Sequence, residues 1–406
     1  MLEKENNTVC PRFPFGSQPG ELEPEYARLR RESPVARVEL PYGGQAWLLT
    51  RMSETKSALG DPRFSRQAMR GDVPRYIEAE IPDDGSLSGL PSMDAPQHLR
   101  TRRLIAQAFT NRRIEAMRPR LTEIVDDLLD RMMAKGRPAD LVADFAAILP
   151  ANAVCLLLGV SYDEWDALGG HVATLMKEGT VPGEQVFIAW QSLRSRLEAL
   201  TVARRAEPGD DLVSALTQAT VGDDSFTDEE IVDHISVIFA AGYETTKCQI
   251  VSSVCALLRY PDQLAWLSRN LDAVPQAVEE LLRYVPLTDA GVLPSVAMED
   301  VELGGVLIPK GDVVYPCPVS ANRDETVFDR ADELDLRRSV GPNRHMAFGH
   351  GPHLCVGAPL ARMELQIALG AILRRMPEIK LAVPEEQLPL KPGLVIRGYD
   401  LFPISW

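Results

Sequence analysis

The sequence predicts a mainly helical protein with small β-sheets, an α+β fold in which residues 1–406 form one domain. Helical periodicity dominates from about residue 97 to 284 and returns over about 356–376. Short alternating segments between glycine and proline turns lie at about 35–51 and 296–320. Because these β-rich segments flank one helical mass, and no repeat or low-complexity linker divides the chain, a single domain is the simplest arrangement.

The first expected elements are a short helix and a hairpin. A helical pattern covers residues 22–32, and apolar residues then alternate with polar ones over 35–40. A Gly43-Gly44 turn and a further apolar run at 46–49 complete the pattern of two antiparallel strands. Beyond residue 286, short apolar runs around further glycine and proline turns predict the second β region.

The longest predicted helix begins at a capping box that starts with Thr227. Its apolar residues fall on several faces, which indicates that the helix is buried. An acid and two hydroxyls nevertheless lie at its middle, in the run Glu244-Thr245-Thr246. From the residues alone, Glu244 can pair with Lys247 one turn later, and the threonines can bond back to carbonyls of the preceding turn.

Composition limits the partners and the compartment. The chain of 406 residues is 45% hydrophobic and 25% charged, with a net charge of -15. Nucleic acid and anionic membranes would repel such a chain, so neither is expected as a partner. Six scattered cysteines predict no disulfide framework, and no apolar run predicts a signal peptide or membrane anchor. We therefore expect a cytoplasmic protein, and we also expect it to be a monomer.

The most informative segment surrounds Cys355 and leads into a helical pattern. A cysteine at a helix N-terminus is favoured as the thiolate, which is the form that binds metals. Glycines in the same loop let the backbone approach a flat ligand closely. Two other interpretations remain open from the residues alone. Cys355 can be a buried, unreactive cysteine, or it can form a zinc site with His350 and His353.

This loop resembles the haem-binding loop of the cytochrome P-450 family, which has the form Phe-x-x-Gly-x-(His or Arg)-x-Cys-x-Gly. Every fixed position is matched, by Phe348, Gly351, His353, Cys355 and Gly357. The resemblance implies the cytochrome P-450 fold, a triangular prism of helices with a minor β region, and haem b (iron protoporphyrin IX) as cofactor. It further implies that Cys355 ligates the iron, that Phe348 shields the sulfur, and that His353 faces a haem propionate.

The central helix strengthens the resemblance. The family has a small residue, Gly, any residue, an acid and Thr at this point, and Ala241, Gly242, Glu244 and Thr245 match in order. By that resemblance the two small residues border the haem and leave room for dioxygen, while Glu244 and Thr245 form the catalytic pair that relays protons. Gly349, in the cysteine loop, is a further expected contact of the haem.

Two other segments match the family, and one departs from it. His98 and Arg102 match the helix that grips the haem propionates. On their own, two charges one helical turn apart are an ordinary surface ion pair, but the resemblance implies a buried structural cluster with a third charge, formed by Glu280, Arg283 and Arg338. The departure is Ser295, which stands where many relatives have an arginine. One propionate is therefore expected to lack its usual charged partner.

The resemblance implies a monooxygenase that activates dioxygen and hydroxylates, epoxidises or couples a mostly apolar small molecule of secondary metabolism. Electrons are expected from a ferredoxin or flavodoxin with an NAD(P)H-dependent reductase, because the chain has no room for a flavin domain. A basic docking patch is expected from Arg103, Arg112, Arg113, Arg344 and Arg362. The alternatives are a ring-coupling or peroxide-using haem enzyme, a haem sensor without turnover, and a zinc-binding helical protein.

Overall fold

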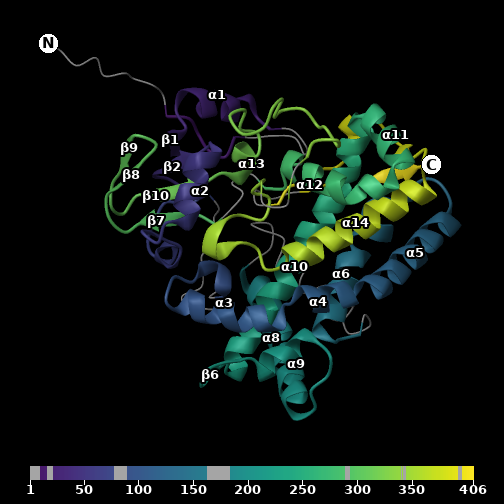
Figure 1. Ribbon diagram of the computed structural model, residues 1–406, viewed down its shortest axis with the longest axis horizontal. Helices are drawn as coiled ribbons and strands as arrows, with labels where there is room; N and C mark the ends of the chain where they lie inside the picture. Colours follow the sequence, from purple (N-terminus) through teal and green to yellow (C-terminus); the bar gives the residue numbers. More distant parts are fainter. Residues whose placement is uncertain are drawn as a thin grey trace.

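The fold is mainly helical with small sheets, as the sequence predicts. A computed structural model describes residues 10–15, 22–76, 89–161, 183–288, 293–339, 341, 344–391 and 396–406. Most strands lie on one side of the molecule and most helices on the other (Figure 1). In the described part of the chain, no helix combines the length and the apolar character needed to cross a bilayer.

The largest sheet joins segments that are far apart in the sequence. Its strand order is β1 (Val35–Glu39), β2 (Gln45–Leu49), β10 (Val313–Pro316), β7 (Ser295–Ala297) and β3 (Phe64–Ser65). The strands β1 and β2 form the antiparallel hairpin that the alternating pattern predicts. The strand β10 runs parallel to β2 and antiparallel to β7, which in turn pairs with β3. The predicted hairpin and two strands of the second predicted β region thus join in one sheet.

Smaller sheets complete the β structure. They are formed by β4 (Ala139–Asp140) with β11 (Lys380–Leu381) and β12 (Pro403–Ser405), by β5 (Thr220–Val221) with β6 (Asp224–Ser225), and by β8 (Val301–Leu303) with β9 (Val306–Ile308). The strands β4, β5 and β6 interrupt the region that periodicity predicts to be helical. Strands of two residues are too short to leave an alternating pattern.

The helices form the larger half of the molecule. They are α1 (Pro24–Glu32), α2 (Met52–Gly60), α3 (Gln97–Ala108), α4 (Asn111–Ala116), α5 (Arg118–Lys135), α6 (Ile148–Leu158), α8 (Gly183–Ala206), α9 (Leu212–Gln218), α10 (Asp228–Arg259), α11 (Pro261–Arg269), α12 (Val274–Tyr284), α13 (Pro318–Ala321) and α14 (Ala358–Arg375). Pro150 lies in the first turn of α6. Main-chain N–H groups of a first turn have no helical partner, so proline is tolerated there.

The centre of the helical half is α10. It starts at the predicted capping box, in which Thr227 and Glu230 each accept a hydrogen bond from the main-chain N–H of the other. It packs against α6, α8 and α14. Most of its apolar residues are buried, including Ile231, Ile235 and Phe239. Burial on several sides fixes α10 against its neighbours, so its polar middle is held in one place.

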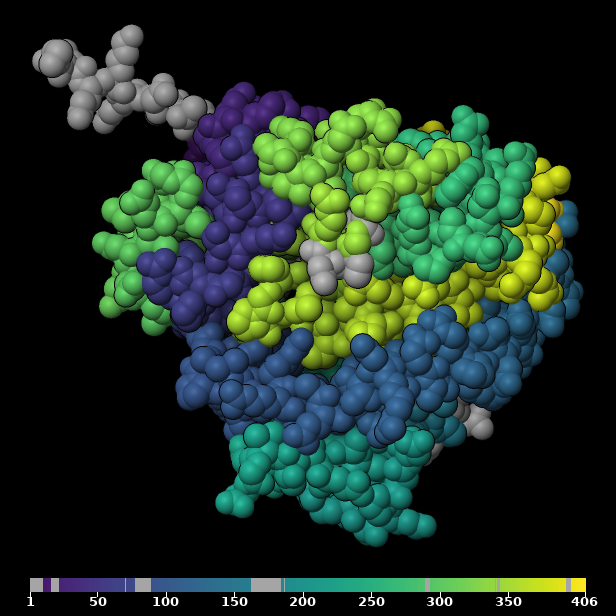
Figure 2. All heavy atoms as spheres, in the orientation of Figure 1, coloured from purple at the N-terminus to yellow at the C-terminus, as the bar shows by residue number. Residues whose placement is uncertain are grey.

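The cysteine loop lies at the molecular surface. In Figure 2 the yellow-green segment that precedes α14 is visible on this face, bordered by the blue of the first helices of the helical half. The segment includes η5 (Gly351–His353), a short helical turn directly before Cys355. Residues from the N-terminal and the C-terminal parts of the sequence therefore meet around this loop.

Candidate active site

Cys355 is held by the backbone of its own loop. Its main-chain N–H donates to the carbonyl oxygen of Phe348 over 2.9 Å, which closes the loop. The main-chain N–H groups of Gly357 and Ala358, at the start of α14, donate to its sulfur. These groups have no partner inside the helix, and they favour negative charge on the sulfur.

The Cys355 thiol nevertheless has a raised pKa. The residue is exposed on one side, but the protein around it removes enough water to outweigh the two N–H groups and the charges of Arg102 and Arg362. A bound metal ion would reverse this balance, because coordination deprotonates a thiol.

The donor set around Cys355 fits haem iron better than zinc. Across the described residues, no group of three or more histidine, cysteine or acidic side chains could hold a metal ion. A structural zinc site needs four protein ligands. A single thiolate suits a metal that brings its other ligands with it, as the iron of a porphyrin does.

Glycine is required at two positions of the loop. Gly349 and Gly351 have φ values of 77° and 70°, a region that other residues rarely adopt. A Cβ on Gly351 would also lie 2.7 Å from the carbonyl oxygen of Leu59, at the end of α2. The loop can follow this path against α2 only because both positions lack a side chain.

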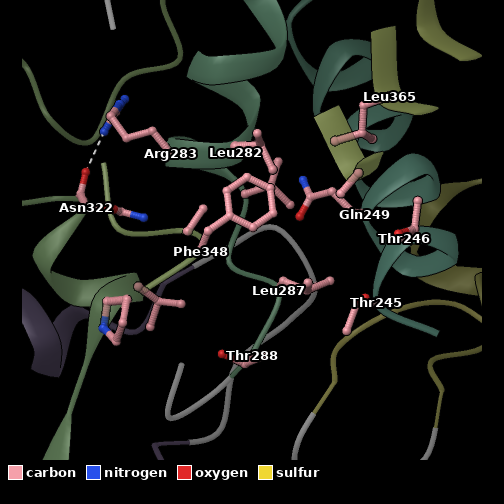
Figure 3. Close-up of a pocket in the computed structure, with 15 residues that line it drawn as sticks. Thr245, Thr246, Gln249, Leu282, Arg283, Leu287, Thr288, Asn322, Phe348 and Leu365 are labelled. Carbon is pink, nitrogen blue, oxygen red and sulfur yellow. Dashed lines mark hydrogen bonds between the residues drawn. The ribbon is translucent and has the colours of Figure 1, made fainter. Parts of the chain in front are cut away.

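A cavity lies between the cysteine loop and α10. Figure 3 shows the ring of Phe348 at its centre, with Thr245 and Thr246 of α10 on one side and Leu287 below. The guanidinium of Arg362 covers the Phe348 ring, 4.5 Å from its centre. The cavity therefore lies next to the cysteine loop and is bordered by the polar middle of α10.

The two threonines of α10 differ in their contacts. The Thr245 hydroxyl is half-buried and donates to the carbonyl oxygen of Ala241 over 2.6 Å, while Thr246 is buried. Ala241 is exposed toward open space. A Cβ on Gly242 would lie 2.9 Å from a methyl group of Val154, so this glycine permits the close packing of α10 on α6. Sequence reasoning expected Gly242 to leave room for oxygen, and the packing contact is an additional reason for it.

Glu244 is held by two lysines. Its carboxylate lies 2.7 Å from Lys247 Nζ, the helical pairing that the residues alone suggest, and 3.2 Å from Lys391 Nζ near the C-terminal end of the chain. Burial on its own raises the pKa of Glu244, but the two ammonium groups outweigh it and keep this pKa below its usual range. The carboxylate is therefore ionised near neutral pH.

His98 and His353 lie against each other at the other edge of the loop, with their ring planes tilted by 42°. Their ring centres are 4.0 Å apart. Burial and then the charge of Arg66 lower the pKa of His353 to about 3, and burial and then Arg102 lower the pKa of His98. His98 Nε2 is buried and has no hydrogen-bond partner in the described structure. The site thus contains a cation that sequence reasoning missed, Arg66, which no motif in the sequence singled out.

The predicted structural charges lie together in the interior. The carboxylate of Glu280 accepts from Arg283 over 2.7 and 2.8 Å and from Arg338 over 3.1 Å. Arg283 also donates to the carbonyl oxygens of Asn322 (Figure 3), Ala331 and Glu333. Glu280 and Arg283 are almost fully buried, and each charge in this cluster is matched by an acceptor or a donor.

The expected basic patch is smaller than the sequence suggests. Arg103, Arg112 and Arg344 are exposed. Arg113 is half-buried and donates to the Ala108 carbonyl oxygen. Arg362 is also half-buried and binds the carboxylate of Glu279 over 2.7 Å. Arg362 therefore serves the interior beneath Phe348 rather than a docking surface.

Comparisons with known proteins agree with this geometry. The family model described as Cytochrome P450 matches residues 189–394. Nocardicin C N-oxygenase of Nocardia uniformis subsp. tsuyamanensis is 44% identical over 97% of this chain and 98% of its own length. Mycinamicin IV hydroxylase/epoxidase of Micromonospora griseorubida is 42% identical over 97% and 98%. A solved structure of the mixed-function P450 MycG is 42% identical, with a TM-score of 0.92 over 98% of this chain and 100% of that chain.

The fold, the cysteine loop and these relatives define a haem-thiolate enzyme that activates dioxygen. The chain belongs to the cytochrome P450 family. It is a P450 monooxygenase of secondary metabolism, and it uses haem iron, a redox partner and dioxygen to oxidise a mostly apolar small molecule. The relatives do not support the zinc-binding protein or the haem sensor that the residues alone left open.

Proposed function

We propose that the cofactor is haem b with Cys355 as its axial ligand, and that the enzyme adds one oxygen atom to a bulky, mostly apolar secondary metabolite. The observation that carries the proposal is the single sulfur at the start of α14, which receives two main-chain N–H groups. Relatives named for nocardicin C and mycinamicin IV support a secondary metabolite as the substrate.

Several residues would hold the cofactor. His98, Arg102 and His353 offer donors to the haem carboxylates, and Phe348 covers the side of the cavity next to the sulfur. Thiolate-ligated haem, when bound, supplies reductive activation of dioxygen. The protein contributes the position of the substrate, the exclusion of water and the delivery of protons.

Proton delivery would depend on α10. The Thr245 hydroxyl lines the cavity, but its single O–H donates to the Ala241 carbonyl oxygen, so it must leave that carbonyl before it can donate a proton from Oγ1 into the cavity. Glu244 is ionised and is held by Lys247 and Lys391 one residue away from Thr245. We infer that Glu244 must first separate from one lysine, which raises its pKa, and take up a proton from solvent before it can pass that proton toward Thr245.

Electron delivery would use a separate ferredoxin or flavodoxin with its NAD(P)H-dependent reductase. The exposed Arg103, Arg112 and Arg344 would attract an acidic partner of this kind. We further propose that the enzyme is monomeric and works in the cytoplasm, where its six cysteines remain reduced.

The ligand assignment is tested by the absorbance spectrum of the reduced carbon monoxide complex. The wild-type protein should show the strongly red-shifted Soret band of thiolate-bound haem, and Cys355→Ser should abolish it. Cys10→Ser, which changes a cysteine outside the site, should leave the band in place. A wild-type spectrum like that of a histidine-ligated globin would overturn the assignment.

The proton path is tested by two neighbouring substitutions. Thr245→Ala should divert reducing equivalents to hydrogen peroxide while haem content and substrate affinity remain near normal, because control over proton delivery is lost. Thr246→Ala is the matched control and should remain coupled. Product formed per NADPH consumed is the measurement. Uncoupling by Thr246→Ala alone would mean that the assigned register of α10 is wrong by one residue.

A further inference from the structure

Ser295 lacks the positive charge that an arginine provides at this position in many members of the family, and another cation lies beside it. The residue is buried on β7, where its backbone pairs with Val314 of β10. On the other side of β7 lies β3, whose Ser65 pairs with Val296 and whose Phe64 pairs with Ala297. This antiparallel register sets the residue after Ser65 next to Ser295. That residue is Arg66.

Arg66 is a buried cation. Only 9% of its surface is exposed, and burial lowers the pKa of its guanidinium to about 10. One of its guanidinium nitrogens donates to the Pro91 carbonyl oxygen over 3.2 Å. A guanidinium carries five N–H donors, so a single carbonyl leaves most of them available.

The described residues supply no carboxylate within ion-pairing distance of the Arg66 guanidinium. Asp94, whose charge does act on Arg66, accepts instead from the Ser65 hydroxyl and, over 3.0 Å, from the main-chain N–H of Arg66. A buried charge that lacks a partner strongly destabilises a protein. The guanidinium therefore needs an anion that the described part of the chain does not provide.

The surroundings of Arg66 point to where that anion binds. The charge of Arg66 acts on both His98 and His353, so the three side chains lie around one space. His98 Nε2 is buried there without a hydrogen-bond partner among the described residues. Arg102 contributes a further positive charge to the same two histidines. Four donors thus converge from α3, the cysteine loop and the residue that follows β3, and Asp94, the carboxylate whose charge acts on Arg66 and His98, is hydrogen-bonded to Ser65 and to the main chain instead.

We propose that the Arg66 guanidinium binds a carboxylate of the haem, in the place of the arginine that many relatives have where this chain has Ser295. The proposal rests on haem being bound as described under Proposed function. The small Ser295 side chain leaves space beside β7, and Arg66 enters the site from the adjacent strand. The positive charge is thus supplied by the residue that follows β3 instead of by position 295 on β7. The site thereby keeps its affinity for a cofactor with two carboxylates.

The test is the rate at which the holoprotein releases haem to excess apomyoglobin. Arg66→Met keeps the length of the side chain and removes its charge and donors. We expect it to accelerate release about 10-fold to 100-fold, the range for loss of a hydrogen bond between charged groups. Arg66→Lys should be intermediate, because one ammonium cannot make two parallel bonds to a carboxylate. Arg63→Met is the matched control, since Arg63 is an exposed arginine on the same segment that binds Asp61.

Two further measurements separate carboxylate binding from a purely structural role. Adding Ser295→Arg to Arg66→Met should restore slow release, because the charge returns from the neighbouring strand. With haem dimethyl ester in place of haem, Arg66→Met should no longer change the release rate, because the ester lacks the charge that Arg66 binds. If Arg66→Met accumulates poorly, the comparison of Arg66→Lys with wild type on both cofactors gives the same test.

Equal release rates for wild type and Arg66→Met with native haem would overturn the proposal. An equal acceleration by Arg66→Met with haem and with its dimethyl ester would also overturn it, because the effect would not involve the carboxylates. Both results would leave the proposed function intact if the thiolate spectrum is present. Absence of that spectrum from the wild type would instead reject the proposed function itself.

Discussion

Two charged clusters flank the cysteine loop, and they are built in opposite ways. Around Glu280, two arginines bind one carboxylate, and the remaining donors of Arg283 reach main-chain oxygens. Around His353, two histidines and two arginines converge, and in the described structure no carboxylate forms an ion pair with either arginine, although the charge of Asp94 acts on Arg66 and His98. The first cluster is complete within the chain, whereas the second requires an anion from outside.

The two clusters therefore have different roles: the first stabilises the fold, and the second binds a ligand. A buried cluster whose charges are all paired stabilises one arrangement of the backbone, and the loss of one member leaves the others unpaired. The second cluster holds two arginines without a carboxylate ion pair in the described structure and two histidines whose pKa burial lowers, so it does not stabilise the fold by itself. It gains its favourable energy when a ligand of opposite charge binds. Substitutions in the two clusters should therefore have different readouts.

The largest expected effect is on folding. Glu280→Gln removes the charge that both Arg283 and Arg338 bind, so the free energy of unfolding should fall by about 3–5 kcal/mol. Denaturant unfolding of the holoprotein measures it. Glu302→Gln, on an exposed position of β8, is the control and should change little. Equal stability of Glu280→Gln and wild type would mean that the paired cluster is not structural.

The second effect should be on haem retention rather than on folding. Arg102→Met removes a cation of the unpaired cluster, so haem release should accelerate about 10-fold, as expected for loss of a charged hydrogen bond. Helix content, measured by circular dichroism, should stay the same. A loss of helix content as large as that of Glu280→Gln would contradict the contrast between the clusters.

A smaller effect concerns the acid side of the pH range. Burial raises the pKa of Glu279, but hydrogen bonds from His345 and Arg362 outweigh it and hold this pKa below its usual range. The resulting stability is present above the unfolded pKa of about 4.3 and is lost as the pH falls through the folded value. Glu279→Gln should therefore flatten the decline of stability below about pH 5. An unchanged slope would show that Glu279 does not couple folding to protons.

The smallest effect is expected for Ser295→Arg in the wild-type background. The sequence alone predicts stronger haem retention, because the usual arginine returns. With Arg66 already beside this position, a second guanidinium adds repulsion as well as a donor, and the release rate should change less than about 3-fold. A large decrease in the release rate would indicate that Arg66 does not supply the missing charge.

Sequence reasoning succeeded where the determinants are local. The loop from Phe348 to Gly357 and the pair Glu280 and Arg283 lie within single segments, so both can be matched to motifs of the family, although the residues alone left other roles open for Cys355. The capping box at Thr227 is local in the same sense. These contacts depend on turn and helix geometry, which a short stretch of sequence encodes.

The missed features depend on pairing between distant segments. Arg66 reaches the site because β3 pairs with β7, and Lys391 reaches Glu244 from near the end of the chain. Gly242 is required by a methyl group of Val154 on another helix. Strand register and helix packing are properties of the assembled fold, so no window along the sequence reports them.

The order of strands in the largest sheet also has a consequence for synthesis on the ribosome. The hairpin β1–β2 emerges early, but its parallel partner β10 is made only after most of the helices. The strand β3, which directly precedes Arg66, likewise cannot pair until β7 has been synthesised, and Cys355 is synthesised after β10. Parallel pairing between distant segments is slow to form. The haem-binding loop and the cation cluster are therefore completed together, late in translation, and cofactor insertion should follow release of nearly the whole chain.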